Sequence, residues 1–436
     1  MAYKNYVFVL PTQSICIIIP LINKFINRFC KKRYRKQPMK ILHTADLHLG
    51  KKLNKAARLD EQCEVIKQLS EICDEQDIDV ILIAGDIFDT SVPTSEAERV
   101  FYRSILTLAE RGRAVIALAG NHDDERRLCA AKPLADLQGI VLAGELDYSG
   151  LTDQTLSDPT PPPSLFGLFD AADYIQKQRT KIEGHYGGVS VVKEGERVNI
   201  ALVPYPAESR LSRWFEQDYK LDYKDRVKLA IDKACEFFDD NYNILCTHLF
   251  LSKTETDALG GLVALPSTVL PEKADYVALG HVHKHLRINK SPLAEYSGSP
   301  LQYAYDEGRT KSVNIIDTVK RTVTQQIITA GKNLTETDAD NFDECMHKLD
   351  FFSNDYVRLK YSGDPLTRDE TAQIRSHPAF NDLVITSALK DEQKIERRAH
   401  LSDDEIFKLY YSHRCNGEPS AELRAAFIEL MNELKD

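Results

Sequence analysis

The sequence lacks the features that mark several protein classes. It has nine cysteines in 436 residues, and none of them forms a C-x-x-C pair. Isolated cysteines argue against a disulfide-stapled secreted domain and against a structural zinc site, and they predict free thiols in a reducing compartment. Neither a G-x-S-x-G nucleophile elbow nor a phosphate-binding P-loop is present. The sequence therefore does not carry the usual signatures of serine hydrolases or P-loop nucleotidases.

An apolar run long enough to cross a membrane is also missing. The longest uninterrupted apolar stretch in the first forty residues is 15–19, whereas a spanning helix needs about 20 residues. Residues 1–40 hold nine basic side chains and no acidic one, and the basic cluster follows the apolar stretch, which is the reverse of a secretory signal. We expect residues 1–38 to be a non-native or disordered extension of a cytoplasmic protein with no stable membrane association. A membrane anchor with a polybasic flank is the alternative.

The rest of the chain is acidic. The formal net charge is −10, and after residue 40 there are 47 basic against 66 acidic side chains, a balance of −19. Such a body does not attract nucleic acid through its overall charge. If the substrate is a polyanion, metal ions or a partner must supply positive charge.

From residue 40 onward, strand and helix patterns alternate. Short apolar runs that end in a turn are typical of strands buried on both faces, and they lie at 41–43, 80–84, 114–119, 199–203, 244–247 and 276–279. Helical spacing is found at 59–74, at 95–111 with Ser95 as the expected N-cap, and at 223–239. This alternation predicts an α/β domain over 39–332, with helices covering a central sheet.

After residue 332 the pattern predicts a smaller α/β domain, over 333–392. Its expected elements are a helix at 340–349, a strand at 356–361, a helix at 367–376 and a strand at 383–385. Residues 393–436 are expected to be helical, with one apolar face formed by Leu423, Phe427, Leu430, Met431 and Leu434. This face could pack on its own domain or dock on a partner.

Side chains of the metal-ligand type follow five of the predicted strands. They are Asp46, His48, Asp86, Asn121, His122, His248, His281 and His283. Any one of them could be a helix cap, a turn residue or a structural histidine, but the carboxyl ends of several strands converge on one crevice in α/β sheets. Carboxylate, imidazole and amide ligands without thiolate favour Mn²⁺, Fe²⁺ or Zn²⁺. Seven ligands are too many for one ion, whereas two ions about 3.5–4 Å apart would use them all and could hydrolyse a phosphate ester.

Written as motifs, D-x-H, G-D, G-N-H-D, H and G-H-x-H, these residues resemble the signature of calcineurin-like metallophosphoesterases. Residues 42–51, 85–89 and 91–93 are similar, more narrowly, to the SbcD family of bacterial nuclease subunits, which is of the Mre-eleven type. The motifs cover about 39–330, and the remainder is similar only in layout. The resemblance implies a sandwich of two sheets flanked by helices, with a small α/β capping domain and C-terminal helices.

The resemblance also implies roles for the site residues. One metal would be bound by Asp46, His48, Asp86 and His283. The second would be bound by Asp86, Asn121, His248 and His281, with Asp86 as the bridge. His122 would be a catalytic residue that does not bind metal. Some relatives carry histidine where this chain has Asp89, so we assign Asp89 no role.

Cofactors and partners follow from the same resemblance. It implies two divalent ions, with Mn²⁺ expected, and DNA as the substrate of a double-strand 3′–5′ exonuclease and single-strand or hairpin endonuclease. The terminal helices would dock on SbcC, an SMC-like ATPase, in a heterotetramer that contains a homodimer of this chain.

Two other functions stay open from the sequence. One is a phosphoesterase or cyclic-nucleotide phosphodiesterase of the same superfamily acting on small molecules. The other is a non-catalytic scaffold at DNA ends. Arg58, Arg126 and Arg127 lie near the motifs and are candidates for phosphate contacts, with solvated surface arginine as the alternative.

Overall fold

The computed structural model describes residues 38–54, 56–146, 179–214, 221–252 and 264–385, together with single positions at 407, 408, 411, 419, 420, 423, 424 and 427. The chain divides after Gly331 into two compact units. Nearly all of the predicted extension 1–38 and most of the predicted terminal helices lie outside the described residues.

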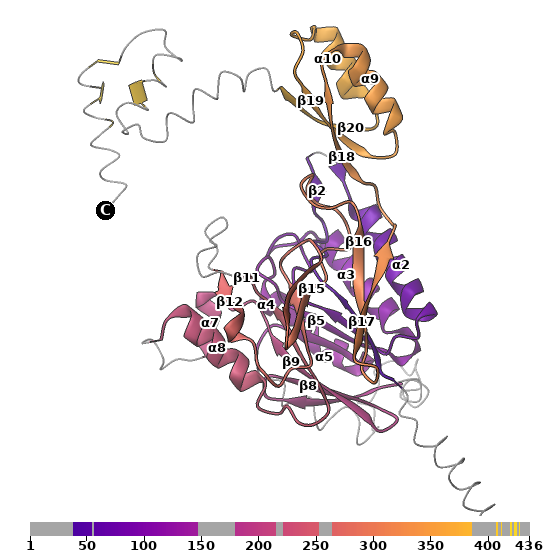
Figure 1. Cartoon of the computed structure of the whole chain (residues 1–436), viewed down its shortest axis with the longest axis vertical. Helices are drawn as coiled ribbons and strands as arrows, with labels where there is room; N and C mark the ends of the chain where they lie inside the picture. Colours follow the sequence, from indigo (N-terminus) through magenta and orange to yellow (C-terminus); the bar gives the residue numbers. More distant parts are fainter. Residues whose placement is uncertain are drawn as a thin grey trace, which may run out of the picture. The chain divides into compact units, whose positions relative to one another are not determined.

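Two mixed sheets form the first unit (Figure 1). The six-stranded sheet has the order β17 (Thr322–Ile328), β16 (Lys311–Asp317), β1 (Lys40–Thr44), β4 (Val80–Ile83), β5 (Ala114–Leu118) and β6 (Ile140–Ala143). The seven-stranded sheet has the order β14 (Leu286–Lys290), β15 (Leu293–Tyr296), β13 (Tyr276–Gly280), β10 (Tyr242–His248), β9 (Glu196–Val203), β8 (Gly188–Lys193) and β7 (Lys181–His185). Strands β1, β4, β5 and β6 are parallel, as are β9, β10, β13 and β15. In each sheet, the carboxyl ends of several neighbouring strands therefore lie at the same end of the sheet.

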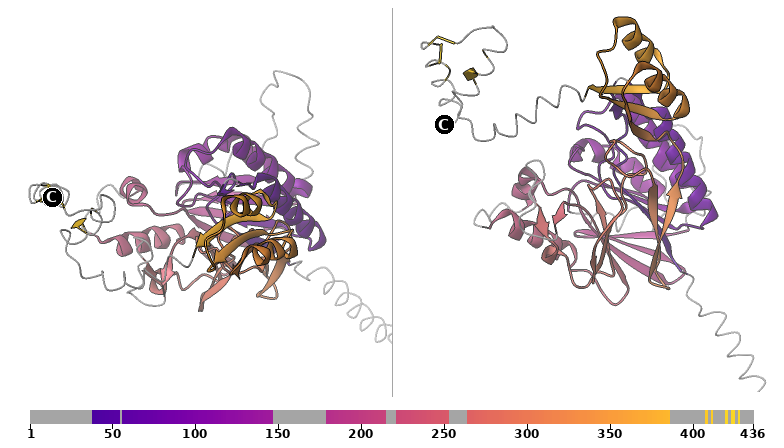
Figure 2. Two further views of the ribbon diagram at one scale, coloured as in Figure 1. Left: turned by 90° about the horizontal axis from the view of Figure 1, so that it is seen from above. Right: turned by 45° about the horizontal axis from the view of Figure 1, so that its top comes forward.

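Helices cover the outer face of each sheet. Helices α2 (Leu59–Glu75) and α3 (Ser95–Leu108) pack together over the six-stranded sheet, with α4 (Glu125–Cys129) and α5 (Lys132–Ala135) beside β6. On the other side, α7 (Glu208–Trp214) and α8 (Tyr223–Ala234) cover the seven-stranded sheet. Figure 2 shows the indigo helices α2 and α3 and the pink helices α7 and α8 on opposite sides of the sheets. The smaller elements are β2 (Lys52–Leu53), β3 (Ala56–Ala57), β11 (Leu251–Ser252), β12 (Leu265–Pro266), η1 (Glu110–Gly112), η2 (Asp136–Gln138) and η4 (Ser267–Val269).

Alternation of side chains along the strands divides the core into three apolar layers. In β4, Ile81 packs under the helices, whereas Leu82 packs between the two sheets. In β10, Ile244 faces the other sheet and Leu245 faces α8. Because both faces of these strands are buried, their residues are almost continuously apolar. The predicted α/β fold of two sheets flanked by helices is confirmed.

Some predicted boundaries were wrong. Helix α3 is capped by Thr94, whose side chain accepts a hydrogen bond from the Ala97 N–H at 3.3 Å, and not by Ser95. The same helix stops at Leu108, because Arg111 adopts a left-handed backbone with φ of 60°. Helix α8 ends at Ala234, five residues before its predicted end. The strands β14–β17 and β6–β8 were not predicted.

The second unit is a small two-layer α/β structure, and its first strand was not predicted. Parallel strands β18 (Leu334–Ala339), β19 (Tyr356–Tyr361) and β20 (Phe380–Ile385) form its sheet, and α9 (Phe342–Phe351) and α10 (Arg368–Ser376) supply its helices. Thr367 and Glu370 form a capping box at the start of α10. Farther on, Phe427 stacks on Phe407 with ring centroids 4.2 Å apart, while Leu423 is exposed. The other residues of the predicted apolar face, Leu430, Met431 and Leu434, lie outside the described residues.

Two further observations concern the described residues as a whole. All six of their cysteines are free. No helix among them combines the length and the apolarity that crossing a bilayer demands.

Candidate metal centre

The eight predicted site residues lie at the carboxyl ends of five strands from both sheets. Strand β1 leads to Asp46 and His48, β4 to Asp86, β5 to Asn121 and His122, β10 ends at His248, and β13 leads to His281 and His283. The loop after β1 runs beside the loop after β4, since the N–H groups of Asp46 and His48 donate to the carbonyls of Gly85 and Asp86, each at 3.0 Å. The structure thus brings residues that are up to 237 positions apart in the chain into one site.

The loops that carry these side chains are strained. Nine non-glycine residues of the described chain have positive φ, and four of them are Asp46 (56°), His48 (43°), Asp86 (49°) and His281 (107°). A left-handed backbone costs an L-residue about 1–2 kcal/mol. Strain of this kind persists only where the surroundings enforce it, and it concentrates at functional sites.

Two glycines let the strand ends approach one another. A Cβ atom at Gly120 would overlap both the main chain and the carboxylate of Asp86. A Cβ atom at Gly280 would overlap the carbonyl of Ala84 and the ring of His248. Because only glycine lacks a Cβ, these positions allow β5 and β13 to bring their following side chains within reach of Asp86.

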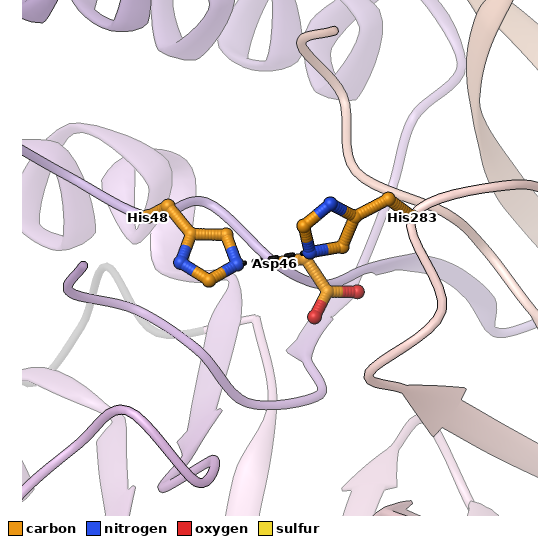
Figure 3. Close-up of side chains that lie close together, drawn as sticks. All are labelled: Asp46, His48 and His283. Atoms are coloured by element: carbon orange, nitrogen blue, oxygen red, sulfur yellow. Dashed lines mark hydrogen bonds between the residues drawn. The ribbon is translucent and has the colours of Figure 1, made fainter. Parts of the chain in front are cut away.

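Candidate ligand atoms gather in three overlapping groups. Within each group the nitrogen and oxygen atoms lie within 4.8 Å of one another, and the groups are Asp46, His48 and His283; Asp46, Asp86 and His248; and His48, Asp86 and His122. Figure 3 shows the first group, in which His48 Nε2 and His283 Nε2 are 3.0 Å apart beside Asp46. Asp86 Oδ2 lies 3.5 Å from His48 Nε2 and 3.5 Å from His248 Nε2. One carboxylate oxygen is therefore shared between the two sides of the site.

The remaining two predicted ligands, Asn121 and His281, lie close to His248. Asn121 Oδ1 lies 2.9 Å from His248 Nε2 and 3.0 Å from His281 Nδ1. The main-chain N–H of His281 donates to Asp46 Oδ1 at 3.0 Å. Asp46, His48, Asp86 and His248 are buried, whereas Asn121, His122, His281 and His283 are half-buried. The site consequently has a buried floor and a rim that solvent and a substrate can reach.

The arrangement of donors and acceptors around His248 fits a bound cation. Its Nδ1–H donates to the Ala84 carbonyl at 2.8 Å, so a neutral ring carries a lone pair on Nε2. That nitrogen faces the oxygens of Asn121 and Asp86, so a proton or a metal cation must lie among these three atoms. Burial would lower the pKa of His248, but the negative charges of Asp86 and Asp46 raise it to about 9. The site therefore stabilises positive charge at this nitrogen.

The two carboxylates of the floor differ. Burial raises the pKa of Asp46 above its ordinary value. Burial acts on Asp86 in the same direction, but His248, His48 and the hydrogen bond from the His122 N–H hold its pKa well below the ordinary range. Asp86 is thus an anion with histidines on two sides. With carboxylate, imidazole and amide donors and no thiolate, this set fits two divalent ions, and the seven side chains Asp46, His48, Asp86, Asn121, His248, His281 and His283 would hold them.

His122 is held by its main chain and by one ring nitrogen. Its N–H donates to Asp86 Oδ1 at 2.9 Å, and its Nδ1 lies 2.7 Å from the carbonyl of Asp89, an acceptor. The proton of that bond is therefore on Nδ1, which leaves Nε2 available for chemistry. Asp89, to which the sequence assigned no role, also binds Lys51 Nζ through its side chain at 2.7 Å.

Two residues that sequence reasoning gave no role fix the loop that carries Asn121 and His122. The buried carboxylate of Asp123 accepts hydrogen bonds from the N–H groups of Gly120, Ile87 and Phe88 at 2.8–3.1 Å. The buried guanidinium of Arg210 donates to the carbonyls of Gly120 and Asp123 at 3.2 and 2.7 Å. Asp123 belongs to the G-N-H-D motif and could have been noticed. Arg210 lies almost ninety residues away and has no signal in the sequence.

Arg210→Lys tests this anchoring. Lysine cannot reproduce the planar fork of arginine. The carbonyls of Gly120, Asp123 and Tyr205, and Glu125, which Arg210 Nε contacts at 3.0 Å, therefore compete for fewer donors. We expect a loss of about 3 kcal/mol in the free energy of unfolding and at least a tenfold drop in turnover. Urea unfolding followed by circular dichroism and a phosphodiester cleavage assay measure the two effects. Arg99→Lys is the matched control, since Arg99 is exposed on α3 and pairs with Glu96; equal effects from the two variants would contradict the anchoring role.

The three arginines that the sequence offered as phosphate contacts differ in exposure. Arg58 is buried, contacts Glu61 and donates to the Gln302 carbonyl, so neither its candidacy as a phosphate contact nor the alternative of a solvated surface arginine was right. Arg126 and Arg127 are exposed.

Comparison with known proteins connects this geometry to a family. The model of the calcineurin-like phosphoesterase family matches residues 39–285. The SbcD component of the SbcCD nuclease of Bacillus subtilis is 32% identical over 424 residues, which cover 91% of this chain and 99% of that protein. The corresponding SbcD component from Escherichia coli K12 is 29% identical over 286 residues, 64% of each chain. A crystal structure of a dimetal phosphatase from Danio rerio matches over 68% of this chain and all of that one, with 13% identity and a TM-score of 0.34.

Proposed function

Since the chain belongs to the calcineurin-like phosphoesterase family and, within it, to the SbcD nucleases, we propose that it is the DNA-cleaving subunit of a two-component nuclease. It is a metal-dependent phosphodiesterase. The observation that carries the proposal is the position of Asp86, whose Oδ2 lies 3.5 Å from a histidine on each side. This position supports a role for Asp86 in holding divalent ions on both sides of the site.

We propose that Mn²⁺ fills both positions. Asp46, His48, Asp86 and His283 would hold one ion, and Asp86, Asn121, His248 and His281 the other. When bound, the two ions supply an acidified water and stabilise charge during in-line displacement at phosphorus. The buried floor fixes these ligands, and the half-buried rim leaves the scissile phosphate room to approach.

His122 completes the site. Because Nδ1–H is held by the Asp89 carbonyl, the ring presents Nε2 to the substrate in a fixed orientation. In its protonated form this nitrogen can donate to a phosphate oxygen or to the departing 3′ oxygen as the P–O bond breaks. The chain thus contributes a proton donor for the leaving group, and the reaction requires no covalent intermediate on serine or cysteine.

The partners follow from the acidic charge and the relatives. A protein with a net charge of −10 binds DNA poorly by itself, so we propose that an SbcC-type ATPase supplies basic surface. Residues 393–436 are the proposed docking segment, residues 333–392 a capping domain that helps to grip DNA, and the assembly a heterotetramer with two copies of this chain. DNA as substrate and free thiols in the described residues support a cytoplasmic location.

A cleavage assay with the chain in complex with its SbcC-type ATPase partner tests the function. Linear duplex and hairpin DNA should be degraded in Mn²⁺, and a chelator should reduce the rate to background because the metals provide the nucleophile. Gel analysis of end-labelled DNA gives the products, and p-nitrophenyl phosphate serves as the small phosphomonoester. If the small ester is hydrolysed while the DNA stays intact, the protein is a small-molecule phosphoesterase and not a nuclease. Metal binding without turnover of either substrate would indicate a scaffold.

A further inference from the structure

A buried polar segment lies directly behind His283. It comprises residues 299–311, from the loop after β15 to the first residue of β16, and its side chains Gln302, Tyr303, Glu307 and Lys311 are all buried. Burial of charged groups costs free energy unless each finds a partner. The partners of these groups are the loops that carry two of the candidate ligands.

Glu307 binds the ring of His283. Its Oε1 accepts a hydrogen bond from His283 Nδ1 at 2.8 Å, while Oε2 accepts from Lys311 Nζ at 2.5 Å and from the Tyr303 N–H at 3.1 Å. A carboxylate offers only acceptors, so the proton of the first bond is on Nδ1. The lone pair of His283 is therefore on Nε2, the nitrogen that lies beside His48 and Asp46 in Figure 3.

Lys311 fixes the main chain of the same residue. Its ammonium donates to the His283 carbonyl at 3.0 Å and to Ser299 Oγ at 2.9 Å, in addition to Glu307. One buried ion pair thus holds both the ring and the backbone of His283. The lysine also balances the charge of Glu307, so the carboxylate can remain buried behind the site.

Tyr303 extends the segment to the loop after β1. Its hydroxyl donates to the Leu47 carbonyl and accepts from Gln62 Nε2 at 3.0 Å, and the same amide donates to the His48 carbonyl at 2.7 Å. The Tyr303 ring lies edge-on to His48 and His283, with centroids 5.4 and 6.0 Å away. The segment therefore contacts both histidines of the first group of candidate ligands.

We propose that Glu307 is a positioning residue of the metal centre, which holds His283 in the Nδ1–H form with Nε2 directed at the ion. Lys311 and Tyr303 set the spacing between His283 and His48. This inference rests on the two-metal site proposed above and adds the element that orients one of its ligands. A carboxylate behind a metal-bound histidine fixes the tautomer and raises the basicity of the ligand, and losing it typically costs about 10–100-fold in metal affinity.

Glu307→Gln tests the proposal through metal binding. Glutamine keeps the size but presents one carbonyl oxygen to three donors and carries no charge. Calorimetric titration with Mn²⁺ should show two ions bound to the wild-type chain, and in the variant one of the two dissociation constants should rise about 10–100-fold. Two unchanged dissociation constants in the folded variant would overturn the positioning role and leave the two-metal site standing. A wild-type chain that binds no Mn²⁺ would instead overturn the proposed function.

The control is Glu196→Gln. Glu196 is also a buried glutamate of the first unit, but it accepts from Thr318 Oγ1 at 2.6 Å at the start of β9, away from the strand ends that carry the site. Its substitution should leave both dissociation constants unchanged, and an equal loss in both variants would assign the effect to general destabilisation and overturn the proposal.

A second measurement needs no substitution at Glu307, in case that variant does not fold. This measurement is an NMR spectrum of the Zn²⁺-loaded chain labelled with ¹⁵N-histidine. The ring resonance that is present in the wild-type spectrum and absent from the spectrum of His283→Gln belongs to His283. We expect the ring to be protonated at Nδ1, with slow exchange of this proton. Protonation at Nε2, with Nδ1 bound to the metal, would overturn the proposal.

Discussion

Asp86→Asn should abolish both the second metal and the reaction. The amide keeps the shape of the side chain but removes the negative charge that lies 3.5 Å from His48 and from His248. We expect at most one Mn²⁺ per chain and a turnover rate at least about 10³-fold lower, because a pair of metal ions contributes several kcal/mol of transition-state stabilisation. Metal analysis after gel filtration gives the stoichiometry, and cleavage of end-labelled duplex DNA gives the rate.

Thermal unfolding provides an independent measure of the same change. A ligand at 100 times its dissociation constant stabilises the native state by about 2.7 kcal/mol, so Mn²⁺ should raise the melting temperature of the wild type and raise that of Asp86→Asn much less. Asp79→Asn is the control. Asp79 is a buried aspartate at the opposite end of β4 and pairs with Lys193 and Arg179 at 2.7 and 2.9 Å. The Asp79→Asn variant should be less stable than the wild type but should still bind both metals. Binding of two metals by Asp86→Asn would refute the bridging role.

His122→Ala should stop cleavage while both metals stay bound. The ring sits on the rim and is held by the Asp89 carbonyl, and its loss removes a proton donor worth about 10²–10⁴ in rate. His122→Asn sharpens the test, because an amide N–H can still reach that carbonyl but has no counterpart of Nε2. We expect it to be as inactive as the alanine variant. Single-turnover cleavage rates and Mn²⁺ stoichiometry are the measurements.

The alternative for His122 is also defined by the structure. His48, Asp86 and His122 form one of the groups that could hold an ion, so loss of one Mn²⁺ in His122→Ala would make it a ligand and contradict its role as proton donor. His185→Ala is the matched control. His185 stacks on Phe237 and contacts Ser190 at 2.8 Å, outside the metal centre, and its substitution should leave both cleavage and metal content unchanged.

The parallel part of the fold could be predicted because its strands are buried on both faces. Such strands are continuous apolar runs, as at β4 and β5, and the helices between them follow a period of 3.6 residues. The hairpin β16–β17 could not be predicted in the same way. Strand β17 is mostly polar, with three polar residues in a row and no regular apolar period, and β16 pairs antiparallel with β1, more than 260 positions earlier in the chain. Pairing over such a separation depends on which edge of the sheet is free, and local sequence does not contain that information.

The candidate metal ligands could be named from the sequence because the chemistry of such ligands restricts them to a few residue types. Asp46, Asp86 and His248 follow apolar strands and stand out by their polarity. Their supporting residues are different. Glu307 and Arg210 are ordinary charged residues in the sequence, and only burial against His283 or against the loop of Asn121 reveals what they do.

The sequence by itself determined the kind of chemistry, because seven carboxylate, imidazole and amide side chains after buried strands fit divalent metals and little else. The tertiary structure alone decided which of these side chains face one another, where Asp86 lies between two histidines, and which tautomers His248 and His283 adopt. The physical reason is that residue type and periodicity are local properties of the chain. Distances between loops of different sheets, and the burial that forces each polar group to find a partner, exist only after the two sheets have packed together.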